Sequence, residues 1–281
     1  MTQPLRDSRS EFGPRRLVFQ LVVLVTLALF GLIGVVLFRP NLIAGLFGHD
    51  MAGHISGHFR YVHHRVHDLT FGFIFGTAIV GMLAQIRRPS ENVAGQLMAL
   101  VPWTTLLLIS ALTTSWVFAP LPILAVLTLA AATLHPSGRN LFRSFRVSRV
   151  NWAMLAMIVI AAVPLLALAI TNVRMQTSVT NDHAALGHYG FMAAFSLTFI
   201  GTGLLASLRP TGWRLTAWVA GLLPALLGIT SLMYPNVDSS LGPAWAVASI
   251  VWSVAFVVTT ELTKRRATAT VTDPSALPSA R

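Results

Sequence analysis

The sequence predicts an all-α integral membrane protein with about eight transmembrane helices. Hydrophobic residues make up 54% of its 281 residues and charged residues only 10%, whereas a water-soluble domain carries roughly 25% charge. Apolar segments of about 20 residues, long enough to cross ~30 Å of hydrocarbon, recur along the chain with short polar joints between them. The chain is therefore expected to be embedded in a lipid bilayer, and lipid is its expected partner.

Eight apolar segments are expected to span the bilayer, each close to the required length. They cover residues 17–38, 67–86, 93–114, 117–134, 151–172, 184–208, 214–234 and 243–262. The first segment exceeds the roughly 7–15 apolar residues of a signal peptide, and Arg39 and Pro40 stand where a small-residue cleavage site would be needed, so it is expected to remain as a helix. Kinks are expected at the prolines inside the spans, which are Pro102, Pro122, Pro164 and Pro224.

Basic residues gather in alternate joints, as expected for an even number of helices. One set of joints holds Arg6, Arg9, Arg15, Arg16, Arg87, Arg88, Arg139, Arg143, Arg146, Arg149, Arg209, Arg214, Lys264, Arg265 and Arg266. The opposite set holds only Arg39, Arg60, Arg65 and Arg174. Since positive loops stay inside, we expect a plasma-membrane protein whose cytoplasmic parts are the N-terminal segment 1–16, the Arg-rich loop 135–149 and a disordered tail at 263–281.

Charge and cysteine content exclude several classes of partner and site. The formal net charge is +11, but the basic residues lie beside helices, where they orient the chain and meet anionic lipid, so no nucleic-acid partner is expected. The chain has no Cys, so a metal would be held by His, carboxylate or Met. The sequence identifies no small-molecule substrate or protein partner, and it leaves open whether the protein is an enzyme.

Two parts of the chain resemble each other. The segment GMLAQIRRP at 81–89 parallels GLLASLRP at 203–210, which predicts a parallel duplication of a four-helix unit, with halves at 17–134 and 150–262. The alternative is that Gly, Leu and Ala recur in any membrane helix. Aligning the two segments lays His67 on His188, so two histidines are expected at equivalent positions near the outer ends of their helices.

Eight of the nine histidines fall on the predicted outer side: His49, His54, His58, His63, His64, His67, His183 and His188. Residues 51–73 carry an apolar stripe at steps of three and four, which predicts an outer-face amphipathic helix before the second span, within a His-rich segment at 49–67. His54 and His58 form one pair at i, i+4 spacing, and His63 and His67 form another.

These histidines predict a metal or b-type haem site at the outer membrane boundary, between the second and sixth spans. His67 and His188 are the expected core ligands, with His63 and His183 as companions. The carboxylates Asp68 and Asp182 are expected to orient the imidazoles, and His54 and His58 are a candidate accessory metal pair. The site could hold Cu, Zn or Fe, or His67 and His188 could be the axial pair of haem b; Cu, Fe or haem would allow redox chemistry.

The histidines are also compatible with roles that need no metal. A His-rich amphipathic segment suits the headgroup region, where it would contact lipid or a protein partner, and clustered imidazoles could sense pH. His188 could make a polar helix–helix contact, and His135 most simply ends the fourth span. The rival function is therefore a small-molecule transporter or a subunit of a membrane complex, although the centres of the spans hold no carboxylate of the kind that ion-coupled transport uses.

The layout resembles haem A synthases in one respect. That family also has eight helices in two similar halves with His near the outer ends of helices two and six, here His67 and His188. It carries further haem-ligating His on helices four and eight, whereas this chain has none in 243–262 and only the boundary residue His135 beside 117–134. The His spacing around 54–64 is similar to the boxes of membrane-bound di-iron desaturases and hydroxylases, which lie on the cytoplasmic side and include a third box that is incomplete here. Neither resemblance assigns the chain to a family.

Overall fold

The all-α class is confirmed by the computed structural model, which describes residues 13–38, 64–114, 121–138, 141 and 150–272. These residues form helices and no strand. The long helices are α1 (Pro14–Phe38), α4 (Arg65–Leu83), α5 (Val93–Thr113), α6 (Leu121–Leu134), α8 (Trp152–Ser178), α10 (His188–Leu208), α11 (Trp213–Met233) and α12 (Pro243–Thr272). Two short elements, the 3-10 helix η3 (Pro89–Glu91) and α9 (Asp182–Ala185), lie between them.

Each predicted span coincides with a helix, and the chain is a multi-pass membrane protein. Seven of the described helices are long and apolar enough to cross a bilayer, whereas α6 has only 14 residues, or about 21 Å at ~1.5 Å per residue. The expected disorder of the tail is wrong for its first part, because α12 continues to Thr272. No Gly or Pro interrupts the chain between Pro243 and Pro274, so nothing in the sequence forces the helix to stop at the membrane boundary.

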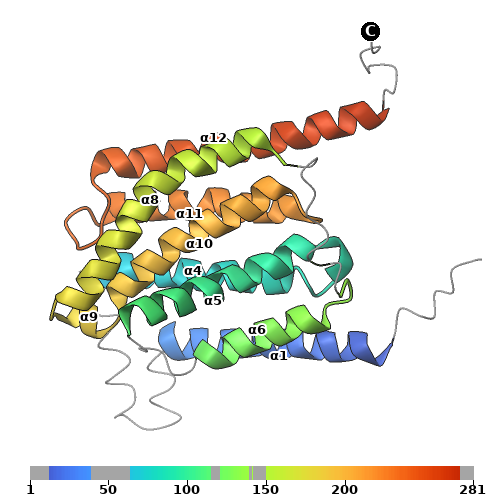
Figure 1. Ribbon diagram of the computed structural model, residues 1–281, viewed down its shortest axis with the longest axis horizontal. Coiled ribbons are helices and arrows are strands. Elements are labelled where there is room, and N and C mark those ends of the chain that lie inside the picture. Colours follow the sequence, from blue (N-terminus) through green and yellow to red (C-terminus); the bar gives the residue numbers. More distant parts are fainter. Residues whose placement is uncertain (1–12, 39–63, 115–120, 139–140, 142–149, 273–281) are drawn as a thin grey trace, which may run out of the picture.

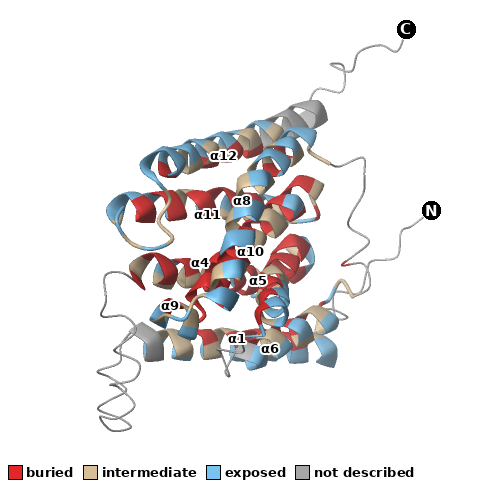
Figure 2. Cartoon of the chain, turned by 60° about the vertical axis from the view of Figure 1, so that its left-hand side comes forward, coloured by how far each residue is buried: buried red, intermediate tan, exposed pale blue. Residues whose placement is uncertain are grey.

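Four helices form the centre of the bundle, namely α4, α5, α10 and α11 (Figure 1). The pair α1 and α6 packs on one side of this group, and α8 and α12 pack on the other. In the apolar membrane-spanning stretch of α10, 72% of the residues are buried, whereas in the corresponding stretches of α1, α8 and α12 only 22% are buried. Figure 2 shows the same contrast, with buried residues concentrated on the central helices. The peripheral helices therefore present most of the surface that meets lipid.

The packing is compatible with the predicted duplication. The pair α4 and α5 has a counterpart in α10 and α11, and each pair contacts both helices of the other. The halves differ at their outer helices, since α8 packs extensively on α10 while α1 contacts α4 only slightly. The duplication stays a prediction.

The two ends of the bundle differ in chemistry. The start of α1 and the end of α12 lie at one end, which we call the arginine end, and α9 lies at the other, the histidine end (Figure 1). The alternating helices carry Arg15, Arg16, Arg87, Arg88, Arg209 and Arg214 to the arginine end. Among the described arginines, only Arg65 and Arg174 stand at the histidine end.

Gly81 allows close approach of α4 and α5. A Cβ atom at this position would lie 2.5 Å from the Gly95 carbonyl oxygen and 2.8 Å from the Ala99 Cβ, whereas a Cβ at Gly76 on the same helix would meet nothing within 4 Å. We expect Gly81→Ala to destabilise the protein by about 1–3 kcal/mol, because the backbone of α5 must move. Gly76→Ala, the matched control, should not lower the thermal midpoint in the same detergent. Equal midpoints for the two variants would contradict the close approach.

His135 follows α6 directly, which agrees with its predicted place at the end of the fourth span. Its ring is buried, its Nε2 lies 3.2 Å from Gln85 Oε1, and its Nδ1 accepts a hydrogen bond from the Ser137 backbone N–H at 3.1 Å. Burial is the main cause that lowers the pKa of His135 from 6.5 to about 4, and it outweighs a hydrogen bond with the Pro89 backbone. A proton on Nδ1 would also face the Ser137 N–H, so the packing requires the neutral ring.

This shift makes stability depend on pH. The unfolded chain protonates His135 near pH 6.5 and the folded chain only near pH 4, so the stability that the neutral ring provides is present above pH 6.5 and lost as the pH falls toward 4. The thermal midpoint of the wild type should fall across this window relative to that of His135→Gln, which keeps a hydrogen-bonding side chain but does not titrate. The difference in unfolding free energy between the wild type and His135→Gln should change by at most about 1.4 kcal/mol per pH unit. Parallel pH profiles would show that His135 does not contribute.

Candidate metal centre

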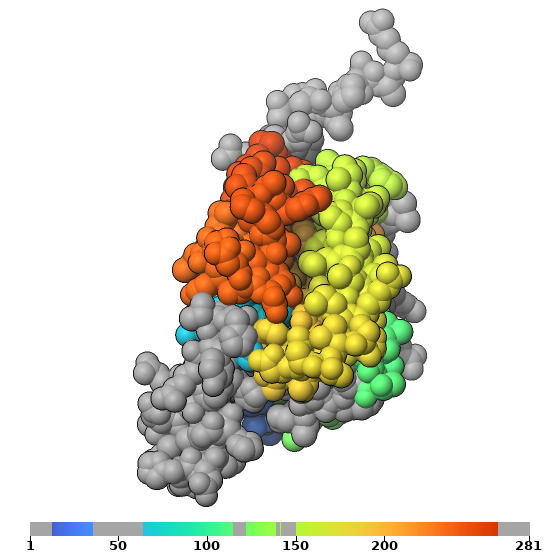
Figure 3. Space-filling view, turned by 90° about the vertical axis from the view of Figure 1, so that its left-hand side faces the viewer, coloured from blue at the N-terminus to red at the C-terminus, as the bar shows by residue number. Residues whose placement is uncertain are grey.

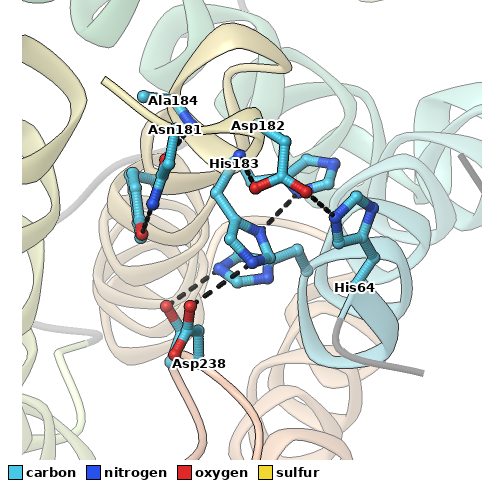
Figure 4. A network of polar contacts seen from close by, with 10 residues as sticks. His64, Asn181, Asp182, His183, Ala184 and Asp238 are labelled. Carbon is cyan, nitrogen blue, oxygen red and sulfur yellow. Dashed lines mark hydrogen bonds and ion pairs between the residues drawn. The ribbon is translucent and has the colours of Figure 1, made fainter. Parts of the chain in front are cut away.

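Four histidines meet at the histidine end of the bundle. His64 immediately precedes α4 and His67 lies in its first turn, while His183 lies in α9 and His188 begins α10. All four are buried, with relative exposures of 3%, 0%, 3% and 6%. The ring of His64 lies 4.6 Å from that of His183 and 4.8 Å from that of His188, and the ring of His67 lies 4.7 Å and 5.0 Å from the same two, centroid to centroid. The four imidazoles therefore form one compact group (Figure 4).

The turn between α9 and α10 brings His183 and His188 face to face. Gly187 adopts a left-handed conformation with φ of 71°, which costs a glycine little and ends the short helix. Asn181 caps α9 by accepting from the Ala184 N–H at 2.9 Å. The result is a distance of 3.1 Å between the Nδ1 atoms of His183 and His188. The expectation that one helix covers 184–208 is wrong at its start, since α10 begins at His188.

Side chains from neighbouring elements hold this turn in place. Gln176 at the end of α8 donates to the Ala184 carbonyl at 2.7 Å and accepts from the Gly190 N–H at 3.0 Å. The Asn181 amide donates to the Tyr189 hydroxyl at 3.0 Å. Gln176 and Tyr189 are buried, where satisfied polar groups specify one arrangement of the backbone. The positions of His183 and His188 are thus set by α8 as well as by their own helices.

Each of three imidazoles has an oxygen partner at its Nε2 atom. Asp182 Oδ2 lies 3.1 Å from His64 Nε2, and Asp238 Oδ2 lies 3.3 Å from His183 Nε2 (Figure 4). Ser239 Oγ lies 2.9 Å from His67 Nε2. The side chains of Asp182 and Asp238 are 58% and 61% exposed, so the carboxylates face solvent while the rings they contact are buried.

Asp238 and Ser239 come from the joint between α11 and α12. Ser239 has a φ of 64°, which is uncommon for a residue with a side chain and costs of order 1–3 kcal/mol. The surrounding structure holds this conformation, and it places the Ser239 hydroxyl against His67. The second half of the chain therefore supplies polar partners from two separate joints.

For neutral imidazoles, these contacts decide which ring nitrogen carries the electron pair. An ionised carboxylate only accepts hydrogen bonds, so Asp182 and Asp238 select the Nε2–H tautomer of His64 and His183. The electron pair of each ring then lies on Nδ1, the nitrogen that a metal ion would use. Ligand atoms of His64, His183 and His188 all lie within 4.8 Å of one another. Two nitrogens on one zinc ion stand about 3.3 Å apart at bond lengths of ~2.0–2.1 Å, so ring rotations that replace the contact between His183 Nδ1 and His188 Nδ1 would complete a three-histidine site.

The structure brings together several predicted site residues. His67, His183 and His188 lie in the group, and Asp182 contacts the imidazole of His64, while its predicted role of orienting a metal ligand stays a prediction. Asp68 follows His67 by one position, about 100° around the helix, and its predicted orienting role stays a prediction. His63 and the pair His54 and His58 lie outside the described residues, as does most of the expected amphipathic helix before α4.

Three contributors were missed by sequence reasoning. His64 was not among the predicted ligands, although its spacing of three residues from His67 puts both on one helix face and is visible in the sequence. Asp238 and Ser239 had no such signal, because Ser239 is 172 residues from its partner His67. Comparisons with family models, with curated proteins and with solved structures found no match for the chain.

Proposed function

We propose that the protein binds a transition-metal ion at the membrane boundary, with His64, His183 and His188 as ligands. The observation that carries this proposal is the convergence of three buried imidazoles whose ligand atoms lie within 4.8 Å of one another. Imidazole ligands suit Zn, Cu, Fe and Ni. Carboxylates that bind the second nitrogen of a ligating histidine are a regular part of such sites, and Asp182 and Asp238 stand in that position.

The packing of the rings favours a bare ion over haem b. An axial pair of histidines needs a porphyrin between the two rings, whereas the rings of His67 and His188 stack at 5.0 Å with an interplanar angle of 15°. Both of these rings also lie against His183. His67 is best placed as a side wall of the site, although rotation about its Ser239 contact would make it a fourth ligand.

Three nitrogen ligands leave a coordination position open, as in catalytic rather than structural zinc sites. The half-exposed carboxylates of Asp182 and Asp238 border the buried rings on the solvent side. A metal ion entering the site from water, or a small substrate approaching the bound ion, would pass between them. Copper at this position would support one-electron redox chemistry, and zinc would act as a Lewis acid. The identity of the ion therefore decides the class of reaction.

We place this site on the outer face of the plasma membrane, with both termini in the cytoplasm. The arginines favour this orientation, because Arg15, Arg16, Arg87, Arg88, Arg209 and Arg214 stand at the arginine end, whereas among the described arginines only Arg65 and Arg174 stand at the histidine end. A reporter that fluoresces only in the cytoplasm should be active when fused after Arg281. A periplasmic-type phosphatase fused at the same position should be inactive, and the reverse pattern would overturn the orientation.

The test of the function is metal analysis of protein purified in detergent without chelator. We expect about one Zn, Cu, Fe or Ni per chain by elemental analysis and no Soret band in the absorption spectrum. Protein stripped with EDTA should rebind about one equivalent of at least one of the four ions when each ion is offered separately. A wild type that is metal-free and does not rebind any of them would overturn the proposal and favour a transporter or partner-binding role, and a Soret band would restore the haem hypothesis.

A further inference from the structure

An apolar pocket of about 580 Å³ opens between α8 and α12. Figure 3, seen from the histidine end, shows the hollow between the yellow-green column of α8 and the orange column of α12. Residues from α10 and α11 form its inner wall, including the buried Phe195, Phe199 and Leu227. The volume lies in the range of ligand pockets, roughly 300–1,000 Å³, and the pocket reaches from the peripheral helices to the core of the bundle.

The depth of the pocket matches one leaflet of a bilayer. Along α12 it extends from Gly242, just before the helix, to Trp252, which is about 15 Å at ~1.5 Å per residue and half of the ~30 Å hydrocarbon thickness. Beyond this depth α8 and α12 are joined, because the Trp252 indole N–H donates to the Met157 carbonyl at 3.3 Å and the Thr259 hydroxyl contacts Met157 Sδ at 3.7 Å. The hollow thus begins at the histidine end and stops near the middle of the membrane.

Two of the residues that line the pocket are prolines inside helices. Pro164 in α8 and Pro224 in α11 both line the pocket, and a proline inside a helix removes a backbone hydrogen bond and bends the axis. The two helices that border the pocket, α8 and α12, are mostly exposed in the bundle, so in a bilayer their outer faces would meet lipid and a lipid acyl chain would lie next to the pocket. Trp245, which also lines the pocket and is 61% exposed, stands at the membrane boundary, where indole rings are favoured.

We propose that this pocket is a specific site for one acyl chain of a phospholipid from the leaflet on the histidine side. Its lining is apolar, its length is that of one leaflet, and the two helices that border it are among the most exposed of the bundle. Ser240 and Leu241 in its wall directly follow Asp238 and Ser239, which contact His183 and His67. An acyl chain bound here would pack against the joint between α11 and α12, which contacts two of the four imidazoles. The proposal does not depend on a metal at the histidines.

The test is native mass spectrometry of protein extracted from phosphatidylcholine nanodiscs and washed with detergent, in the presence of EDTA. We expect the wild type to retain one phosphatidylcholine per chain after bulk lipid is removed. Ala248→Phe fills the pocket from α12, so its lipid occupancy should fall at least tenfold. The matched control is Ala255→Phe, seven residues further along the same helix, exposed and outside the pocket, and it should retain the lipid.

Folding of each variant is checked by helical circular dichroism and size exclusion. If Ala248→Phe does not fold, Ala167→Phe places the same ring in the pocket from α8 and should give the same loss. A wild type that loses all lipid in the wash, or a pocket-filled variant that retains as much lipid as Ala255→Phe, would overturn the proposal. Because chelator is present throughout, this outcome is separate from the outcome of the metal analysis.

Discussion

Purified His183→Ala protein should hold less than about a tenth of the metal that the wild type holds under the same conditions. His183 is the centre of the group, since its Nδ1 lies 3.1 Å from that of His188, its Nε2 lies 3.3 Å from Asp238 Oδ2, and its ring contacts those of His64 and His67. Its removal deletes one ligand and disconnects a carboxylate. The loss in affinity should therefore exceed the ~10–100-fold typical of an orienting partner.

The matched control for this experiment is His135→Ala, which removes an equally buried histidine at the arginine end. It should keep a stoichiometric metal and the wild-type dissociation constant. His67→Ala separates the two roles considered for His67. If His67 only lines the site, its removal should lower the metal affinity little. If it is a fourth ligand, its removal should lower the metal affinity as much as removal of His183. An unchanged dissociation constant in His183→Ala protein of normal helical content would exclude the proposed ligand set.

Asp238→Asn should weaken metal binding by about 10–100-fold while leaving the fold intact. The amide keeps the shape of the carboxylate and its 61% exposure makes the change well tolerated, but the amide has no negative charge. It can still accept a hydrogen bond from His183 Nε2, yet it no longer stabilises the charge that a bound cation places on the imidazole. Asp182→Asn should act in the same way through His64.

Two further variants give this measurement its controls. Glu91→Gln neutralises a carboxylate that pairs with Arg88 at 3.3 Å at the other end of the molecule, and it should not change the dissociation constant measured by competition with a chelating dye. Asp68→Asn tests the orienting role that the sequence predicts for Asp68. Equal affinities for Asp238→Asn and Glu91→Gln would show that the carboxylates at the histidine end do not support a metal.

The helices could be predicted closely because lipid leaves few alternatives. A backbone inside a bilayer has no water to bond to, so a long apolar run with few charges predicts a spanning helix wherever it occurs. The limits of this reasoning appear at helix ends. The apolar run predicts the start of α10 four residues early, because it continues through Gly187, whose left-handed backbone separates α9 from α10. The membrane-spanning part of α12 is predicted to within one residue, since it covers Pro243–Thr263, but hydropathy does not predict that the helix continues to Thr272.

The candidate site was predicted in part. His67 and His188 follow from the internal similarity of two segments, and His183 and Asp182 from proximity in sequence to His188. The choice of His63 as the partner of His67 depends on helical phase, and one residue changes the direction of a side chain by about 100°. The described structure has His64 in the group.

By itself the sequence determined that this protein lies in a membrane, the order of the apolar helices that the structure describes and the gathering of histidines at one end, because these depend on composition and on spacing within single segments. The tertiary structure alone decided which imidazoles meet and which carboxylates hold them. Asp238 and Ser239 reach His183 and His67 only because packing brings the joint between α11 and α12 to the first turn of α4 and to α9. The physical reason is that a binding site needs groups within a few ångströms, and helix packing brings together residues more than a hundred positions apart.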